Sequence, residues 1–504
     1  MKPLPPSLAL PPIPRWSLRV LVLVHVLAGA AMGLSVDEAH YLLYALRPAL
    51  SYFDHPPLVG WIQWPLVAAQ VPEAALRVLP ALVWWGTLAG VYRLTRHVLS
   101  AQPATEALAE SAATWALAAL ALAPLLHVLG LGLLPDTLLM AWTVAVMACT
   151  WSLMHRPPET GTASWLLLGA LLGLAGLSKY TAIFAALAVL LCLLQAHGWA
   201  LLRHRGPWLA LVLALALVSP VLVWNLQNQW VSFAYQAQHG AGGGWKGVEF
   251  VRFVVVQLLA YGPLLLAAVA GWRAAPSAVR ALAWFAAIPL GVLGYLSGGG
   301  TGLPHWTAPA WVAAAPLAGL GLARWAQQGW RGWLRVLGGL QALACTALVA
   351  LMLTAGWPFA QGSDDTVAPA PNPFADLYGW QQAGALARGL AQREGLAALA
   401  VQNWTLASRL GWYARPLPVQ VLEDRFTQFS LWHAPMQPGG DALLVDWSHM
   451  AYDVPMAPHG FTRCRLLDTL PVQHQGRPLA SFRFYACYGW EGSPAPQLTR
   501  RGTP

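Results

Sequence analysis

The sequence predicts a polytopic α-helical membrane protein that carries a small C-terminal α/β domain. Hydrophobic residues make up 57% of its 504 residues and charged residues only 10%, whereas soluble domains carry about 25% charged residues. Apolar runs long enough to cross a hydrocarbon core of ~30 Å recur up to residue 357. Beyond that point the composition becomes polar, with short helical and strand patterns typical of a water-exposed domain.

About eleven apolar runs are expected to form spanning helices, because a backbone inside the bilayer has to satisfy its hydrogen bonds internally. Lys2, Arg15 and Arg19 precede the first run, which lacks a small-residue cleavage site, so an uncleaved first span is expected. The predicted spans cover residues 17–35, 75–96, 109–127, 136–154, 163–178, 181–197, 207–225, 250–271, 280–297, 306–323 and 336–356.

Basic residues in the short connections predict the orientation of these spans. One side, shared with the N-terminus, holds Arg93, Arg96, Arg156, Arg203, Arg205, Arg273, Arg280, Arg324, Arg331 and Arg335, whereas the other side holds Arg47, Lys179, Lys246 and Arg252. The positive-inside rule then places the N-terminus in the cytoplasm and the C-terminal domain outside. The net charge of +9 therefore reflects topology, and no basic stripe with interleaved aromatic residues indicates nucleic-acid binding.

Two outer connections are long, at residues 36–74 and 226–249. The first contains Pro56 and Pro57, which stop helices, together with Trp61 and Trp64, which favour the membrane interface. Short surface helices are therefore expected there. The second connection contains a run of glycines, Gly240 and Gly242 to Gly244, which predicts a mobile segment able to act as a lid.

The chain is predicted to divide into a membrane domain at 1–357, a proline-rich linker at 358–375 and an extracytoplasmic α/β domain at 376–504. Within that last domain the pattern predicts helices at 378–395 and 404–413, strands at 397–402, 417–422 and 441–446, and a hairpin of 461–468 with 479–488. Cys464 and Cys487 lie on the two hairpin strands. They would pair in an oxidising compartment, and two unpaired thiols fit the pattern equally well.

Ionisable side chains gather at the outer ends of the predicted spans. The set comprises Asp37, Glu38, Asp54, His55, Asp136, Lys179, His239 and His305, with Tyr52 and Trp306 beside its members. A charge at the centre of a spanning helix costs ~2.5–3.5 kcal/mol, and acidic residues contribute little to orientation. Simpler explanations exist for single members, such as helix capping by the acids and snorkelling by the lysine. One shared site accounts for all of them together.

The chemistry of this set suits sugar transfer from a lipid-linked phosphate. A carboxylate has to accept the proton of the attacking group, and Asp37 is placed for that role. Cations have to stabilise the departing phosphate, which Lys179 and His55 can do. No glycine-rich strand–helix motif is present, so a nucleotide sugar or nucleotide cofactor is not expected.

These residues carry a resemblance to a known family. The chain resembles the bacterial polyprenyl-phosphate-dependent GT-C glycosyltransferases, related to the protein O-mannosyltransferases and the lipid A aminoarabinose transferases. The similar stretches are residues 37–41 (DEAHY), 52–58 (YFDHPPL), 135–136 (PD), 177–181 (LSKYT), 224–225 (WN), 230–233 (WVSF), 239–240 (HG) and 305–309 (HWTAP), with 407–413 and 428–432 in the outer domain.

The resemblance implies roles for the matching positions. Asp37, Glu38 and Asp136 are the predicted catalytic residues: Asp37, with Glu38 beside it, would lie closest to the reacting centre, and Asp136 would line the same cavity. Asp54 with the loop histidine His239 would hold a divalent metal ion. The aminoarabinose transferases carry lysine at the position of His55, and histidine is only partly charged at neutral pH. This difference argues against aminoarabinose transfer and moves the phosphate contact towards Lys179.

The predicted protein is thus an inner-membrane enzyme of a bacterium, whose partners are a polyprenyl-phosphate sugar, membrane lipids and a lipid, protein or glycan acceptor. The expected reaction is an inverting hexosyl or pentosyl transfer. A transporter or flippase of a polyprenyl-linked sugar is the alternative, but transporters usually place ionisable groups near the bilayer midplane and show repeats. A ligase or polymerase of the O-antigen type would share the lipid substrate without these motifs.

Overall fold

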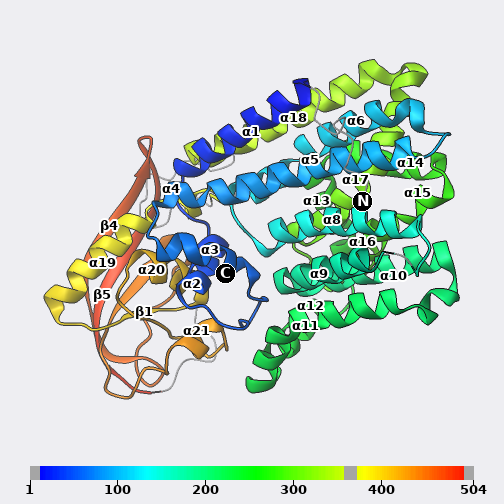
Figure 1. Cartoon of the computed structure of the whole chain (residues 1–504). Helices are drawn as coiled ribbons and strands as arrows, with labels where there is room; N and C mark the ends of the chain where they lie inside the picture. Colours follow the sequence, from blue (N-terminus) through cyan, green and yellow to red (C-terminus); the bar gives the residue numbers. More distant parts are fainter. Residues whose placement is uncertain (1–11, 160, 357–371, 493–504) are drawn as a thin grey trace. The chain divides into compact units, whose positions relative to one another are not determined.

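The computed structural model describes residues 12–159, 161–356 and 372–492 (Figure 1). The chain forms two compact units. The first comprises residues 1–27, 48–62 and 70–347, and the second comprises residues 28–47, 63–69 and 348–504. The second unit thus includes two segments that precede most of the predicted spans. Most of the predicted linker lies at 357–371, outside the described residues.

The first unit is built from helices (Figure 1). Its helices, some of which continue into the second unit, are α1 (Pro12–Ala30), α3 (Leu58–Ala68), α4 (Glu73–Leu76), α5 (Val78–Ser100), α6 (Ala109–Ala121), α7 (Pro124–Leu131), α8 (Pro135–Met154), α9 (Thr162–Ser178), α10 (Ile183–His197), α11 (Arg205–Gln227), α12 (Val231–Ala241), α13 (Gly247–Tyr261), α14 (Ala268–Ala274), α15 (Ser277–Ala281), α16 (Trp284–Ser297), α17 (Ala308–Trp325) and α18 (Arg331–Thr354).

Six helical segments among the described residues are long and apolar enough to cross a membrane, or eight if each of two bent helix pairs is one span. The six are Glu73–Ser100, Pro135–Met154, Tyr180–His197, Arg205–Gln227, Ser277–Ser297 and Pro304–Thr354. The last segment contains 51 residues and changes direction at Gly329, whose φ is 96°. The predicted helical membrane fold is confirmed, and the number of eleven spans stays a prediction.

Two predicted spans are not straight helices. The span expected at 109–127 is split into α6 and α7, which meet at 71°, and the span expected at 250–271 is bent by 103° after α13. Pro124 begins α7 and has no N–H to continue α6. Gly262 has a φ of 79° and is followed by Pro263, so α13 ends there.

One buried glutamine satisfies backbone groups at both bends. The Gln341 amide of α18 donates to Leu122 O after α6 at 3.1 Å and accepts from Leu264 N after α13 at 3.3 Å. Its side chain is 5% exposed. Backbone groups freed within a membrane have to find a partner inside the protein, and Gln341 supplies one to each break.

The two long connections predicted for the outer side are mostly helical. Residues 36–74 form α2 (Val36–Leu46), α3 and α4, which confirms the expected short helices. The connection at 226–249 contains α12 in its centre, and residues 242–246 join α12 to α13. The mobile, lid-like role of its glycines stays a prediction. Gly243 N donates to Gly299 O at 3.0 Å, which ties this short connection to the end of α16.

The second unit contains a five-stranded sheet in the order β2-β1-β3-β5-β4 (Figure 1). Parallel pairs join β1 (Leu399–Val401) to β2 (Val419–Val421) and β3 (Ala442–Trp447), and antiparallel pairs join β5 (Arg477–Trp490) to β3 and β4 (Phe461–His474). The helices of this unit are α2, α19 (Trp380–Glu394), α20 (Trp404–Tyr413) and the short α21 (Gln428–Trp432), which the sequence pattern did not predict.

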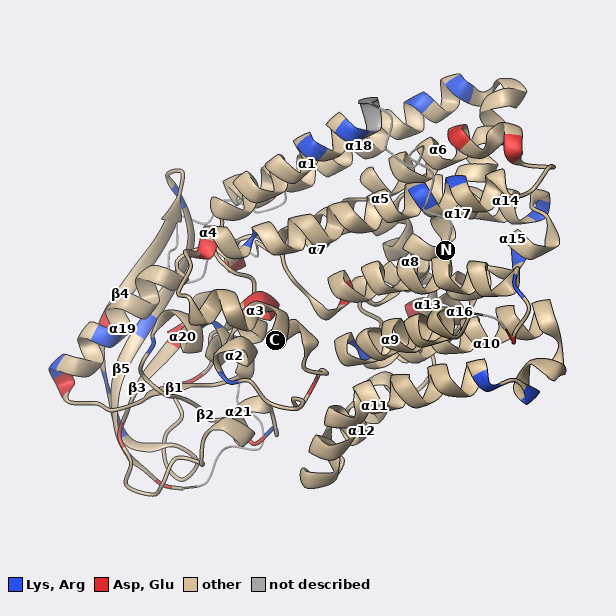
Figure 2. Cartoon of the chain, viewed as in Figure 1, with Lys and Arg blue, Asp and Glu red and all other residues tan. Residues whose placement is uncertain are grey.

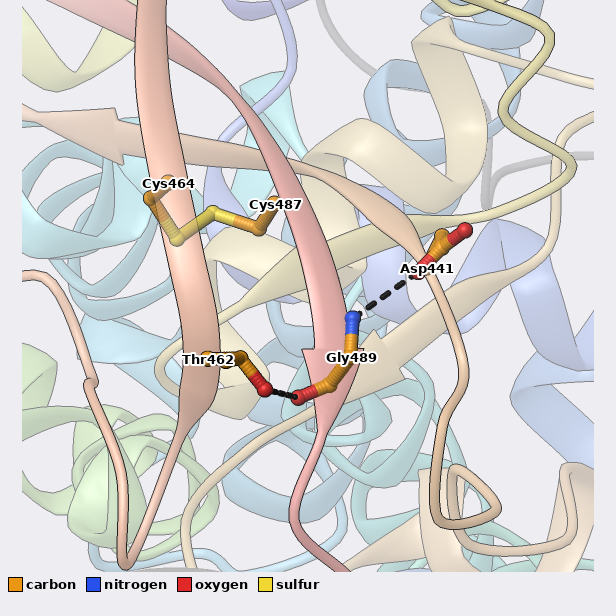
Figure 3. Close-up of a disulfide and its surroundings, with 5 residues drawn as sticks. All are labelled: Asp441, Thr462, Cys464, Cys487 and Gly489. Atoms are coloured by element: carbon orange, nitrogen blue, oxygen red, sulfur yellow. Dashed lines mark hydrogen bonds between the residues drawn. A yellow bond between two sulfur atoms is a disulfide. The ribbon is translucent and has the colours of Figure 1, made fainter.

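The hairpin of β4 and β5 is longer than expected. It turns at Gln475 and Gly476, whose φ values of 50° and 77° match the left-handed pair that a tight two-residue turn requires. Cys464 and Cys487 lie opposite each other in the register and form a disulfide (Figure 3). Nearby, Thr462 Oγ1 donates to Gly489 O and Gly489 N donates to Asp441 Oδ1, each at 2.9 Å.

Candidate functional site

A buried ion pair forms the centre of the candidate site in the first unit. Asp136 lies in the first turn of α8, and Lys179 follows the last residue of α9. Lys179 Nζ donates to both carboxylate oxygens of Asp136 at 2.6 Å. The two residues are only 4% and 2% exposed. A buried lysine without an anion would be strongly unfavourable, so Asp136 is what allows a charged Lys179 at this depth.

An imidazole and an indole complete the wall around this pair. His305 Nε2 lies 3.9 Å from Asp136 Oδ2, and the Lys179 ammonium lies 5.9 Å from the centre of the Trp306 ring. Both side chains come from the single turn Pro304–Thr307 before α17. The structure therefore brings together four residues that the sequence predicted for one site, although they come from three separate parts of the chain.

A hydrogen-bonded network beside the pair was not predicted. Gln257 Oε1 accepts from Thr307 Oγ1 at 2.5 Å and from Trp311 Nε1 at 2.8 Å. Tyr261, one turn further along α13 and fully buried, donates to Pro304 O at 2.9 Å. The sequence feature that could have identified this network is Gln257 inside an apolar run, because polar residues within spanning segments mark functional or packing positions.

The loop at residues 51–57 is held by α12. Ser232 Oγ donates to Tyr52 O at 3.0 Å, and Gln236 Nε2 donates to Asp54 O at 2.6 Å. The Tyr52 ring is fully buried and its hydroxyl accepts from Ala49 N at 3.1 Å. Burial raises the pKa of Tyr52 well above its usual value, so this hydroxyl stays neutral. Asp54 and the neighbouring His55 are half-buried.

Polar side chains also gather around Tyr180, the residue after Lys179. Ser51, Asn225 and Ser232 lie around its hydroxyl, and the Asp54 carboxylate acts on it electrostatically. Among the described residues, Ser51 Oγ, Tyr180 Oη and Asn225 Oδ1 are buried without a hydrogen bond of good geometry. These polar side chains therefore form one buried cluster directly beside Lys179.

The predicted metal site is not formed by the described side chains. His239 lies in α12 instead of a loop, and its side chain is outside the described part of the structure. No three histidine, cysteine, aspartate or glutamate side chains within the described ranges gather to hold an ion. Asp54 alone is too few ligands to hold a divalent ion. Metal binding by Asp54 and His239 therefore stays a prediction, and the proposed reaction does not use a metal.

The acidic pair Asp37 and Glu38 lies at the start of α2, in the second unit. Ser35 caps this helix, because its side chain accepts from Glu38 N at 3.4 Å. The Glu38 carboxylate accepts from Ser35 N at 3.0 Å and from Ser35 Oγ at 2.9 Å, which completes a capping box. Glu38 is thereby committed to the helix end, whereas the half-buried Asp37 is not part of the box.

Helix α2 is fixed within its unit by α20 and the segment before α19. Gly33 N donates to Leu377 O and Leu34 N donates to the Tyr413 hydroxyl, each at 3.1 Å. His40 Nδ1 lies 3.0 Å from Ser408 Oγ. Ser408 already donates its proton to Trp404 O, so His40 donates here and carries its proton on Nδ1.

A buried arginine supplies positive charge near Asp37. Arg409 is 2% exposed, forms an ion pair with Asp376 and lies 4.4 Å from the centre of the Trp380 ring. Burial lowers the pKa of Arg409, and the charges of Asp376 and Asp37 oppose that effect. In the sequence, Arg409 appeared only within the stretch 407–413 that carries the family resemblance. Nothing there indicated that Arg409 interacts electrostatically with Asp37.

The predicted site residues therefore fall into two sets, one in each unit. Tyr52, Asp54, His55, Asp136, Lys179, His305 and Trp306 belong to the first unit, and Asp37 and Glu38 belong to the second. Their meeting in a single pocket stays a prediction.

Comparison with known proteins gives a family match over part of the chain and a similar fold over most of it. Residues 54–224 match the sequence model of the dolichyl-phosphate-mannose-protein mannosyltransferase family. No curated protein sequence matches the chain. Two solved structures of ArnT from Cupriavidus metallidurans, one in the apo state and one bound to undecaprenyl phosphate, are similar, with TM-scores of 0.58 and 0.57 and sequence identities of 16% and 15%.

The alignment with ArnT covers 92% of this chain and 96% of that chain in both cases. The structural likeness therefore extends over both units, while the family match is confined to the segment that contains Asp54, Asp136 and Lys179. The predicted resemblance is confirmed at this level: residues 54–224 match the mannosyltransferase family model, and the chain has the fold of ArnT.

Proposed function

We propose that this protein is a glycosyltransferase that moves a sugar from a polyprenyl-phosphate carrier to an acceptor at the outer face of the inner membrane. The observation that carries the proposal is the buried Lys179–Asp136 pair with Trp306 beside it. It lies where α8 begins and α9 ends, next to the cluster of polar side chains around Tyr180.

Lys179 is proposed to bind the donor phosphate. An ammonium has three donors, and two carboxylate oxygens of Asp136 occupy part of that capacity. As the bond between the sugar and the phosphate breaks, its electrons move to the phosphate and the negative charge there grows. A fixed cation in a site of low dielectric stabilises that charge. Asp136 is then a positioning residue that keeps Lys179 charged and oriented.

Asp37 is proposed to be the base. In a single displacement the acceptor's nucleophilic atom bonds to the anomeric carbon, its proton passes to the Asp37 carboxylate, and the polyprenyl phosphate leaves on the opposite face. The anomeric configuration is thereby inverted. Glu38 was predicted together with Asp37 as catalytic, but the capping box engages its carboxylate, so we assign it to holding α2.

The relatives support the donor class. The family is named for a dolichyl-phosphate-mannose donor, and one ArnT structure holds undecaprenyl phosphate. A flippase remains the second candidate. Against it, Asp136, Lys179 and His305 lie at one end of α8, α9 and α17, whereas transporters place such groups near the bilayer midplane.

The test uses membrane vesicles that contain the full-length protein and a labelled polyprenyl-phosphate sugar. Asp37→Asn is expected to reduce transfer at least 100-fold, within the range that general bases contribute, about 10²–10⁴-fold. Asp468→Asn, an exposed carboxylate on β4, is the control and should leave transfer unchanged. Full activity of Asp37→Asn would reject the base assignment, and movement of lipid across the bilayer without transfer would favour the flippase.

A further inference from the structure

A large apolar groove in the first unit plays no part in the proposed transfer. Its volume is about 800 Å³, and its walls come from η5 (Pro263–Ala267) and helices α14, α16 and α17. Leu265, Val269, Ala287 and Leu290 form part of these walls, and Trp311 lies among the lining residues from α17. This size falls in the range of ligand pockets, about 300–1,000 Å³.

The opening of the groove is polar and aromatic. His155 at the end of α8, Gln195 near the end of α10, and Trp272 and Arg280 near α15 line it. Trp272 is 44% exposed, as expected for an indole at a membrane interface. Figure 2 shows that the basic residues of the first unit gather at this end of the helices, around the α10–α11 connection and α14–α15.

Arg280 presents a positive charge at this opening. Its Nε donates to Ala275 O at 2.6 Å, and its guanidinium lies 5.8 Å from the centre of the Trp272 ring. These contacts orient the side chain without neutralising it. In the described part of the chain no carboxylate forms an ion pair with Arg280. An exposed, oriented arginine beside an apolar groove is complementary to a molecule with an anionic head and an apolar chain.

The opening lies far from the candidate transfer site. Asp136 is in the first turn of α8 and Met154, which lines the groove, is its last residue. At about 1.5 Å per residue these positions are about 27 Å apart along the helix, close to the thickness of a hydrocarbon core. A lipid head at Arg280 and a donor phosphate at Lys179 would therefore occupy opposite leaflets.

We propose that this groove binds an anionic phospholipid of the cytoplasmic leaflet, which is the leaflet on the side of the arginine-rich connections. An acyl chain would lie along the apolar walls, and the phosphate would lie at Arg280. Basic pockets between spanning helices on the cytoplasmic side are suited to such head groups. An apolar wall of this length is complementary to an acyl chain, which inorganic phosphate lacks. The proposal does not depend on the reaction proposed for Asp37 and Lys179.

The experiment places the full-length protein in bilayers that contain phosphatidylglycerol with a photoactivatable group on one acyl chain. Cross-links are located by mass spectrometry of peptides. They are expected within residues 263–290, at a yield about fivefold higher than with the matching phosphatidylcholine probe, because one basic residue contributes about 1 kcal/mol to binding an anionic lipid surface. Equal yields from the two probes, or no cross-link in this segment, would overturn the proposal.

Two pairs of variants separate head-group recognition from groove filling. Arg280→Gln should lower the phosphatidylglycerol yield to that of phosphatidylcholine, whereas Arg335→Gln, an exposed arginine of α18 outside the groove, should not. Ala287→Trp should fill the groove and lower both yields, whereas Ala344→Trp on the exposed surface of α18 should lower neither. A phosphatidylglycerol preference that persists in Arg280→Gln would show that this arginine does not bind the head group.

Discussion

At the scale of single residues, the candidate site depends on one charge and its partner. Asp136 begins one predicted span, Lys179 lies in the connection that follows another, and their pairing is a tertiary contact that no local pattern in the sequence encodes. The sequence analysis identified both residues because each is an ionisable group at the end of an apolar run. It assigned them separate roles, whereas the structure joins them in one buried ion pair.

Removing Asp136 is expected to harm stability as well as activity. Asp136→Asn leaves the lysine buried without an anion, which costs about 3–5 kcal/mol in comparable pairs. Replacing both residues, with Asp136→Leu and Lys179→Met, should recover most of that loss while transfer stays absent. Thermal unfolding in detergent measures the stability. A single variant as stable as the wild type would show that Asp136 does not compensate the lysine charge.

His433 is expected to make the second unit sensitive to acid. Arg47 Nη1 donates to His433 Nε2 at 3.0 Å, and burial together with the Arg47 charge lowers the pKa of His433 below its usual value near 6.5. The unfolded chain therefore binds this proton at a higher pH than the folded one. The free energy of unfolding should fall as the pH decreases below about 6.5.

The measurement is the unfolding temperature between pH 8 and pH 5. His433→Gln should reduce its dependence on pH, whereas the exposed His459→Gln should leave the dependence as in the wild type. An unchanged pH profile in His433→Gln would mean that another group titrates.

At the scale of elements, the sequence predicted helices better than their bends. The predicted helix at 404–413 has the observed bounds of α20, where the Asn403 side chain caps the first turn. Apolar composition continues across Pro124 and across Gly262, so hydrophobicity alone suggested two unbroken spans. The bends follow from backbone chemistry at these residues, and their stability depends on Gln341, which is distant in sequence.

Gln341→Leu is expected to destabilise the first unit by about 1–3 kcal/mol, because it leaves Leu264 N without this acceptor and weakens the bonding of Leu122 O. Gln327→Leu, at an exposed position, is the matched control. The fraction of protein that survives heating in detergent, measured by size-exclusion chromatography, reports the difference. Equal survival of the two variants would mean that other groups form hydrogen bonds with the backbone at the two bends.

At the scale of the whole molecule, composition was sufficient to predict a helical membrane protein, whereas the orientation indicated by charge placement stays a prediction. The sequence could not predict that residues 28–47 join the unit of the sheet. That assignment arises from backbone bonds such as Gly33 N to Leu377 O, which link positions far apart in the chain. The catalytic candidate Asp37 thus belongs to a unit whose core is the C-terminal sheet.

The disulfide provides a test of orientation. If the C-terminal domain is extracytoplasmic, Cys464 and Cys487 should be protected from alkylation until a reductant is added. Cys464→Ser with Cys487→Ser should then lower the stability of this unit by about 3 kcal/mol, as estimated for a closed loop of similar length. Intact-mass analysis of alkylated membranes distinguishes the states, and reactive thiols before reduction would contradict the predicted topology.

The shared amide of Gln341 has a consequence for motion. Straightening α13 into a continuous helix would break the bond to Leu264 N, and the displaced side chain would also lose its bond to Leu122 O, which would keep the Cys345 thiol as its donor at the other bend. The two breaks are therefore energetically coupled, so a rearrangement of either helix during the catalytic cycle is expected to be accompanied by one in the other.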